Sequence, residues 1–215
     1  PSSKYNSVTR NIPIVVNRID SILSVSDMMF DYGKTGYAAV NVSGATVNLE
    51  NIYVVGHDEA IINFNNGIIS LSNLSAGSYA LSVTTTPDEN HNSVTSIVEI
   101  VVNKADGIIE VDDMTFDYGD SGSTNLTIVG GDIASISIAG HPEIKPKVSN
   151  NRITVSGLDA GNYTLNIESS PDENHNFVSH NVSVTVNEKE SSIEFNKVVQ
   201  PYYGGFGYIF VNVEG

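Results

Sequence analysis

The sequence predicts an all-β protein built from tandem β-sandwiches, and three observations carry this prediction. The first is an internal repeat, in which Asn17 aligns with Asn103 at a shift of 86 and Leu74 aligns with Leu158 at a shift of 84. The second is alternation of apolar and polar residues with period 2, which is typical of half-buried strands. The third is a cluster of Gly, Asn, Asp or Pro at intervals near ten residues, the spacing of short antiparallel strands.

The repeat predicts the division of the chain. The segment "YNSVTRNIPIVVN" from Tyr5 matches "HNSVTSIVEIVVN" from His91, so the chain opens with the tail of one repeat. A further copy begins near Asn187 and stops at Gly215, and the chain starts at Pro1, so we expect a part of a longer array. We predict that residues 1–17 are the terminal strand of a preceding repeat and that residues 18–103 and 104–187 are two whole repeats. Residues 188–215 are predicted to be the first strands of a following repeat.

Strands in each repeat are predicted from the apolar positions. In "YTLNI" the alternation buries Tyr163, Leu165 and Ile167, and "VSVTV" from Val182 to Val186 follows the same rule. About seven such strands in roughly 85 residues favour a two-sheet sandwich over a barrel, although alternation alone leaves the barrel open.

The motif L-x-A-G-x-Y narrows the sandwich to one type. It occurs at Leu74–Tyr79 and again at Leu158–Tyr163, between two apolar strands. A Tyr just after a tight Gly turn is what a tyrosine corner needs, because its ring packs inward while its hydroxyl bonds to the backbone of the crossover. The alternative is a hairpin with an ordinary core Tyr. Two occurrences in register favour the corner at Tyr79 and Tyr163, and so immunoglobulin-like sandwiches of about seven strands each.

With these motifs the sequence resembles the bacterial-type Ig-like (Big) repeats of prokaryotic cell-surface proteins, most closely those of methanogen adhesin-like proteins. The resemblance rests on "FDYG" at Phe30 and Phe116, on L-x-A-G-x-Y, and on "PDENHN" followed by an alternating strand. It covers essentially the whole chain and implies an extracellular stalk or adhesive module at an archaeal or bacterial cell surface. The chain departs from the family form in its last loop, where His replaces the more usual aromatic residue, and in "PYYGG" from Pro201.

Composition limits the classes of function. The net charge of −15 disfavours nucleic acid and anionic membrane surfaces, because phosphate contacts need clustered Lys and Arg. There is no Cys, so disulfides and thiolate metal sites are excluded. No apolar run approaches the roughly 18 residues of a membrane span.

The loop "PDENHN" at Pro87–Asn92 and Pro171–Asn176 is the candidate for chemistry. Its carboxylates suggest a Ca²⁺ site, joined by Asp31, Asp58, Asp117 or Asp120, because Ca²⁺ takes six to eight oxygen ligands. The equivalent loop of the preceding repeat is "PSSKYN", which keeps the Pro and the final Asn but neither carboxylate. We therefore favour a turn with a solvated acidic face over the calcium hypothesis. The calcium candidates are Asp88, Glu89, Asp172 and Glu173.

Catalytic and cofactor-binding residues are not predicted. The five His follow no arrangement such as G-x-S-x-G or H-E-x-x-H, so we expect a protein that is not an enzyme. N-x-S/T sequons give candidate N-glycosylation sites. We take Asn162 as less suited, because it flanks the tyrosine corner. The remaining candidates are Asn41, Asn73, Asn125 and Asn181.

The leading functional hypothesis is a non-enzymatic extracellular stalk or adhesin repeat that projects a distal region from the cell, with neighbouring Ig-like repeats as its partners. One alternative is a module that itself binds another cell, a surface protein or a glycan through its loops or an aromatic patch. Another is a filament subunit whose unpaired terminal strands, at Ser7–Asn17 and Ser192–Gly215, are completed by a second chain. The aromatic patch consists of Tyr202, Tyr203, Phe206 and Tyr208.

Overall fold

The computed structural model describes residues 3–195, 203–206, 209 and 211–214, and over this part of the chain it is all-β apart from one 3₁₀ turn, η1 (Leu49–Asn51). The chain forms two compact units, Pro1–Lys104 and Ala105–Gly215, called unit 1 and unit 2. No helix in the described residues has the length and apolar character needed to cross a membrane. The predicted fold class is confirmed.

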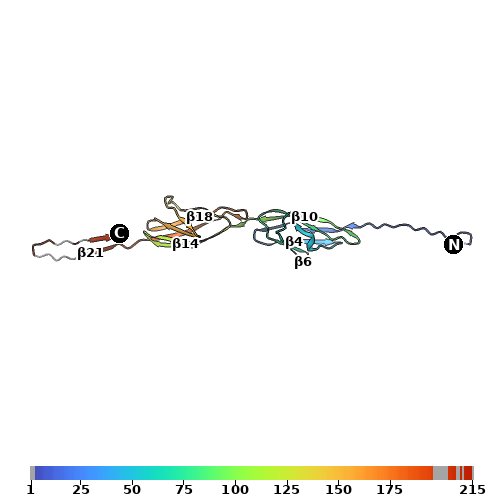
Figure 1. Ribbon diagram of the computed structural model, residues 1–215, viewed down its shortest axis with the longest axis horizontal. Helices are drawn as coiled ribbons and strands as arrows, with labels where there is room; N and C mark the ends of the chain where they lie inside the picture. The colour runs from blue at the N-terminus through green and yellow to red at the C-terminus, as the bar shows by residue number, and fades with distance from the viewer. Residues whose placement is uncertain (1–2, 196–202, 207–208, 210, 215) are drawn as a thin grey trace. The chain divides into compact units, whose positions relative to one another are not determined.

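Unit 1 is a sandwich of two four-stranded sheets, in the orders β2-β4-β7-β6 and β3-β10-β8-β5 (Figure 1). A short parallel pair, β1 with β9, joins the start of the unit to its last loop. The strands are β1 (Ile19–Asp20), β2 (Ile22–Val25), β3 (Met28–Asp31), β4 (Gly36–Ser43), β5 (Ile52–Val54), β6 (Ile61–Asn65), β7 (Ile68–Ser72), β8 (Gly77–Thr84), β9 (His91–Asn92) and β10 (Thr95–Asn103).

Unit 2 repeats this arrangement with the orders β12-β14-β17-β16 and β13-β20-β18-β15, and with the parallel pair β11 and β19. A separate two-stranded sheet, β21 with β22, follows it in the chain. The strands are β11 (Ala105–Asp106), β12 (Ile108–Val111), β13 (Met114–Asp117), β14 (Ser121–Val129), β15 (Ile133–Ile138), β16 (Lys147–Ser149), β17 (Arg152–Ser156), β18 (Gly161–Ser169), β19 (His175–Asn176), β20 (Ser179–Asn187), β21 (Ser192–Phe195) and β22 (Val211–Glu214).

These orders are those of an immunoglobulin-like sandwich, with strands A, B, E and D in one sheet and A′, G, F and C in the other. The first strand is divided between the sheets: β2 pairs antiparallel with β4, and β3 pairs parallel with the last strand, β10. Asp27 stands at the point of division, where its carboxylate accepts a hydrogen bond from the Glu99 amide at 3.3 Å. In unit 2 the Asp113 carboxylate accepts a hydrogen bond from the Ser183 amide at 2.8 Å. An Asp between the half-strands therefore supplies an acceptor where the chain crosses between sheets.

The core of each unit follows the predicted alternation. Leu165 and Ile167 are fully buried, Val182, Val184 and Val186 are buried, and Tyr163 packs partly buried against them. The equivalent positions of unit 1 are also apolar and buried between its two sheets. Burying such a side chain contributes roughly 1.5–3 kcal/mol, and each unit buries a dozen or so of its own.

The second Gly of "FDYGKTG" has a packing reason. The inward ring of Phe30 lies directly over Gly36, so that a Cβ at this position would overlap the ring carbons. Gly122 lies under Phe116 in the same way. The turn therefore combines an aromatic ring on β3 with a bare backbone at the start of β4.

Residues 6–18 have no strand partner within the described chain, and Ile12, Ile14 and Val16 on this segment are exposed. The strands of unit 1 run from Ile19 to Asn103, and those of the sandwich in unit 2 run from Ala105 to Asn187. That residues 1–17 complete a preceding repeat, and 188–215 open a following one, stays a prediction.

Candidate functional site

The loop between β8 and β10, here called the FG loop, is a turn organised by one carboxylate. Asp88 Oδ1 accepts hydrogen bonds from the amides of Asn90 at 2.7 Å and His91 at 2.6 Å. The Nδ1 atom of His91 lies 3.0 Å from the same oxygen and 3.1 Å from Oδ2. The second FG loop, between β18 and β20, has the same pattern: Asp172 bonds the Asn174 and His175 amides and the His175 ring.

The His ring of each FG loop lies against the loop between strands B and C. In unit 1 a Cβ on Gly44 would stand 2.6 Å from His91 Cδ2, so the ring occupies the space above a glycine. In unit 2 the ring of His175 lies against Gly130. Both glycines have positive φ, +75° and +85°. A flat ring therefore packs over a glycine in both units, and Tyr5 at the equivalent position of the opening segment also has a flat ring.

The closing Asn of the loop ties it to the first strand. Asn92 Nδ2 donates to Asp20 Oδ1 at 3.0 Å, and Asn176 Nδ2 donates to Asp106 Oδ1 at 3.1 Å. In the other parallel pair of unit 1, β3 with β10, Asn103 Nδ2 donates to Asp31 Oδ1 at 3.2 Å. The repeated Asn and Asp residues thus form side-chain hydrogen bonds across both parallel strand pairs.

Electrostatics agree with this structural role. The Asn90 amide, followed by the His91 ring and amide, holds the pKa of Asp88 below its ordinary value. For Asp172, partial desolvation raises the pKa, but the hydrogen bonds from Asn174 and His175 together outweigh it, and the net pKa is lowered. Both carboxylates are therefore anionic acceptors at neutral pH.

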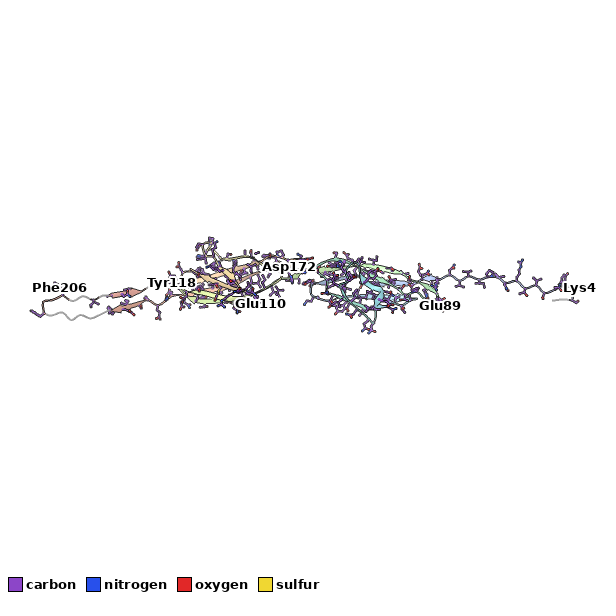
Figure 2. All side chains as sticks on the ribbon, in the orientation of Figure 1. Lys4, Glu89, Glu110, Tyr118, Asp172 and Phe206 are labelled. Atoms are coloured by element: carbon purple, nitrogen blue, oxygen red, sulfur yellow. The ribbon has the colours of Figure 1, made fainter. Side chains whose placement is uncertain are left out.

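The calcium candidates do not form a cluster within the described residues, where no group of three or more His, Asp or Glu side chains is placed to hold a metal ion. Glu89 lies at the loop tip, at the end of unit 1 where the chain enters it (Figure 2). In unit 2, Tyr118 of the turn after β13 and Asp172 of the FG loop lie at opposite ends (Figure 2). Asp117 and Asp120 flank Tyr118, so they lie far from Asp172 and Glu173 of the same unit. Calcium binding stays an untested hypothesis.

Tyr79 and Tyr163 make the hydrogen bond that a tyrosine corner requires. Tyr79 Oη donates to the Ser75 carbonyl at 2.8 Å, and Tyr163 Oη donates to the Asp159 carbonyl at 3.0 Å. Each carbonyl lies four residues upstream, in the crossover between strands E and F. The phenol therefore satisfies the backbone of a turn that has no strand partner.

The sequence did not predict the His that packs on each corner. His57 meets Tyr79 edge to face with ring centroids 4.7 Å apart, and His141 meets Tyr163 at 5.1 Å. The Nδ1 atom of His57 lies 2.7 Å from Glu59 Oε1. This hydrogen bond is the main cause of the lowered pKa of Glu59. The repeated "GH" dipeptide was the available signal. Each of these two His packs on a Tyr ring and has a carboxylate partner, Glu59 or Glu143.

The Asn side chains of the four candidate sequons differ in whether the amide nitrogen is hydrogen-bonded within the fold. Asn41 on β4, Asn125 on β14 and Asn181 on β20 are exposed on outer sheet faces. Asn73 has a positive φ of 65°, and its Nδ2 atom donates to the Glu59 carbonyl at 2.7 Å. The amide nitrogen that would carry a glycan at Asn73 is therefore already engaged within the fold.

A hollow of about 570 Å³ opens at the tyrosine-corner end of unit 1. Lys34, Glu59 and several hydroxyls line it, and none of its lining residues is a His. Of the aromatic patch, Tyr203 and Phe206 are exposed, and Tyr202 and Tyr208 lie outside the described residues.

No protein-family model matches the sequence, and no curated protein matches it. Solved structures of tandem domains are similar to it. The titin domains Z1Z2, solved in complex with telethonin, are 12% identical with a TM-score of 0.41, over 81% of this chain and 100% of that chain. The D00-D0 domain of intimin is 13% identical, over 76% and 100%, with a TM-score of 0.31. Domains 4 and 5 of the S-layer protein SbsC are 14% identical, over 78% and 99%, with a TM-score of 0.33.

Proposed function

We propose that the chain is a non-enzymatic, load-bearing spacer of an extracellular protein, in which Ig-like repeats hold a more distal region away from the cell. The observation that carries this proposal is the pairing of the first and last strands in each unit. Met28–Asp31 pairs in parallel with Ile100–Asn103, and Met114–Asp117 pairs in parallel with Val184–Asn187.

This pairing suits a chain under tension. The polypeptide enters a unit at its first strand and leaves at its last, so a pull along the chain slides two parallel strands past each other. All the backbone hydrogen bonds between them must then break together, whereas a hairpin pulled from its open end loses them one at a time. The Asn103–Asp31 side-chain bond adds to the same connection.

The junction between repeats is short enough for a spacer. One residue, Lys104, separates the end of β10 from the start of β11. A connection of this length restricts bending, while Gly- and Ser-rich linkers of many residues behave as flexible coils. The exposed sequons Asn41, Asn125 and Asn181 support the extracellular location.

Distance measurements between two spin labels test whether the spacer is stiff. Because the chain has no Cys, two engineered Cys residues are the only sites where the labels attach. Thr95→Cys and Ser179→Cys mark the first residues of β10 and β20, which are equivalent positions in the two units. A strand of nine residues spans about 30 Å, so a stiff repeat places the labels about 35–45 Å apart in one narrow distribution.

The control pair, Glu50→Cys with Thr95→Cys, lies wholly within unit 1 and defines the width of a rigid distribution. Labelled chains diluted with unlabelled ones remove distances between molecules. A distribution several times broader than the control would contradict a stiff spacer.

A second candidate function is completion of the terminal strands by another chain. It is favoured by Ile12, Ile14 and Val16, which are exposed although their segment resembles β10 in sequence. We propose that this segment takes the place of strand G in a neighbouring sandwich. Replacing Ile12, Ile14 and Val16 by Ser should then abolish concentration-dependent filaments, and if the wild-type chain forms no filaments, the segment is not used between chains.

A further inference from the structure

One outer sheet face of unit 1 differs sharply from the same face of unit 2. It is formed by β3, β10, β8 and β5, and we call it the apolar face. On it Met29, Tyr53 and Ile97 are 69%, 54% and 67% exposed, and Val55 and Val101 lie beside them. The equivalent positions in unit 2, shifted by 84 or 86 residues, carry small or polar side chains. These are Thr115, Ser137, Asn181, Ala139 and Thr185.

The exposed apolar side chains form two groups on this face, one on each side of Glu99 on β10. Met29 is directly beside Val101 in the parallel register of β3 and β10. Ile97 and Tyr53 flank Ser82 from the two neighbouring strands. Ser82 is only 2% exposed although it points outward, so its two large neighbours close over it. Exposed apolar residues on the opposite sheet, such as Tyr37 beside Ser70, are scattered among polar ones.

We propose that the apolar face binds a second copy of this chain, face to face, so that spacers associate side by side. The proposal goes beyond the spacer function and does not depend on it. Area is the first argument. The exposed side chains present on the order of 500 Å² of apolar surface, comparable with the largest patch on a typical monomer. Two copies would bury roughly 1,000 Å², the low end for a specific interface.

Charge is the second argument for a second copy. The outward residues of β3, β5, β8 and β10, all described by the structure, include two charged side chains, Asp31 and Glu99. The chain as a whole carries −15, so copies repel one another over most of their surface. Only these two of the 25 acidic side chains of the chain lie on the outward side of these strands, so two copies can approach there with little repulsion.

The face is also complementary to itself. A small hollow of about 200 Å³ between β3 and β10 is lined by Asp27, Met28, Met29, Glu99 and Val101. Tyr53 projects from β5, on the other side of β8. A two-fold axis in the plane of contact exchanges these two sides, so the Tyr53 of each copy faces the hollow of the other. The ring would contact Met29 and Val101, and its hydroxyl would donate to Asp27 or Glu99.

Sedimentation equilibrium of the full 215-residue chain tests the proposal. An interface of this size predicts a monomer–dimer equilibrium with Kd of about 10–500 µM. The double variant Tyr53→Ser/Ile97→Asn carries the residues that unit 2 has at the same positions, so the fold accepts them. It should weaken dimerisation at least about tenfold, because it removes the aromatic anchor and half of the apolar area.

The matched control is Tyr37→Ser, which removes an equally exposed Tyr from the opposite sheet and also introduces the residue of unit 2, Ser123. It should leave Kd unchanged. In an NMR dilution series of the wild-type chain, amides of β3, β5, β8 and β10 should shift, and those of β13, β15, β18 and β20 should not. A wild-type chain that stays monomeric to about 1 mM overturns the proposal. So does association that survives the double variant or is lost equally in Tyr37→Ser.

Discussion

Tyr79 and Tyr163 stabilise the same turn in two units to different extents. The hydrogen bond of Tyr79 is 2.8 Å long and partly buried, whereas that of Tyr163 is 3.0 Å long and exposed. A net hydrogen bond contributes about 0.5–1.5 kcal/mol, and more of that survives where water is excluded.

We therefore expect Tyr79→Phe to lower the free energy of unfolding of unit 1 by about 1 kcal/mol, and Tyr163→Phe to lower that of unit 2 by less. Urea titrations followed by NMR signals of each unit separately would measure both values. Equal losses, or no loss in unit 1, would show that the phenol hydroxyl is not what closes the turn.

Asp88 makes the stability of unit 1 depend on pH in the acidic range. Its pKa is lowered in the folded state, so its contribution is complete above the unfolded value of about 3.8. That contribution is lost as the pH falls through the lower folded pKa. Asp88→Asn keeps an oxygen acceptor for the two amides but has no charge to protonate.

The melting temperature of unit 1 should consequently fall less between pH 5 and pH 2 in Asp88→Asn than in the wild-type chain. Glu89→Gln removes a charge from the same loop without touching these hydrogen bonds, and it should keep the acid sensitivity of the wild type. Parallel melting curves for wild type and Asp88→Asn would count against the FG-loop carboxylate as an anionic acceptor.

At the scale of single residues, the sequence predicted identities but few partners. The spacing of L-x-A-G-x-Y was sufficient to single out Tyr79, because its acceptor lies only four residues away. The "PSSKYN" comparison singled out the ring position, but it treated both carboxylates of the loop as variable. In the structure Asp88 organises the turn, because it accepts the Asn90 and His91 amides. Gly44 and Asp20, which contact the FG loop, lie 47 and 72 positions from their partners His91 and Asn92. No local pattern reports contacts across that separation.

Between elements, the contact of the FG loop with the preceding B–C loop depends on Gly44. Gly33 is a matched control, because both glycines have φ of +75° while a Cβ on Gly33 would meet nothing within 4 Å. Ala in the left-handed region costs roughly 1–2 kcal/mol on its own. At Gly44 the new methyl group also displaces the His91 ring from Asp88.

Gly44→Ala should therefore destabilise unit 1 by at least about 1 kcal/mol more than Gly33→Ala does. Denaturant unfolding of the two variants under identical conditions gives this difference directly. If the two losses agree within error, the ring does not rest on the B–C loop in solution.

For whole elements, alternation predicted the long strands β18 and β20 well, because both are half-buried on a regular pleat. It could not predict the division of the first strand between the two sheets. The alternation changes phase at Asp27, because Leu23 and Val25 face inward before it and Met28 and Phe30 after it. This change of phase does not say which strand each half pairs with. The pair β1 and β9 was also missed, since two residues are too short for a periodic signal.

At the scale of the whole molecule, the central claim is that each repeat carries load through its own parallel pair of terminal strands. The two units have separate cores and the same strand order, so each should unfold as one event. Neither depends on a disulfide, because the chain has no Cys. Resistance to tension must then come from packing and from the backbone bonds of β3 with β10 and of β13 with β20.

Single-molecule force spectroscopy, with handles at the two ends of the chain, tests this claim most directly. A repeat of roughly 85 residues releases about 25 nm of chain after its folded length is subtracted. The account predicts two separate force peaks, each followed by an extension of about 25 nm. A single cooperative step of about 50 nm, or extension without a force peak, would contradict it.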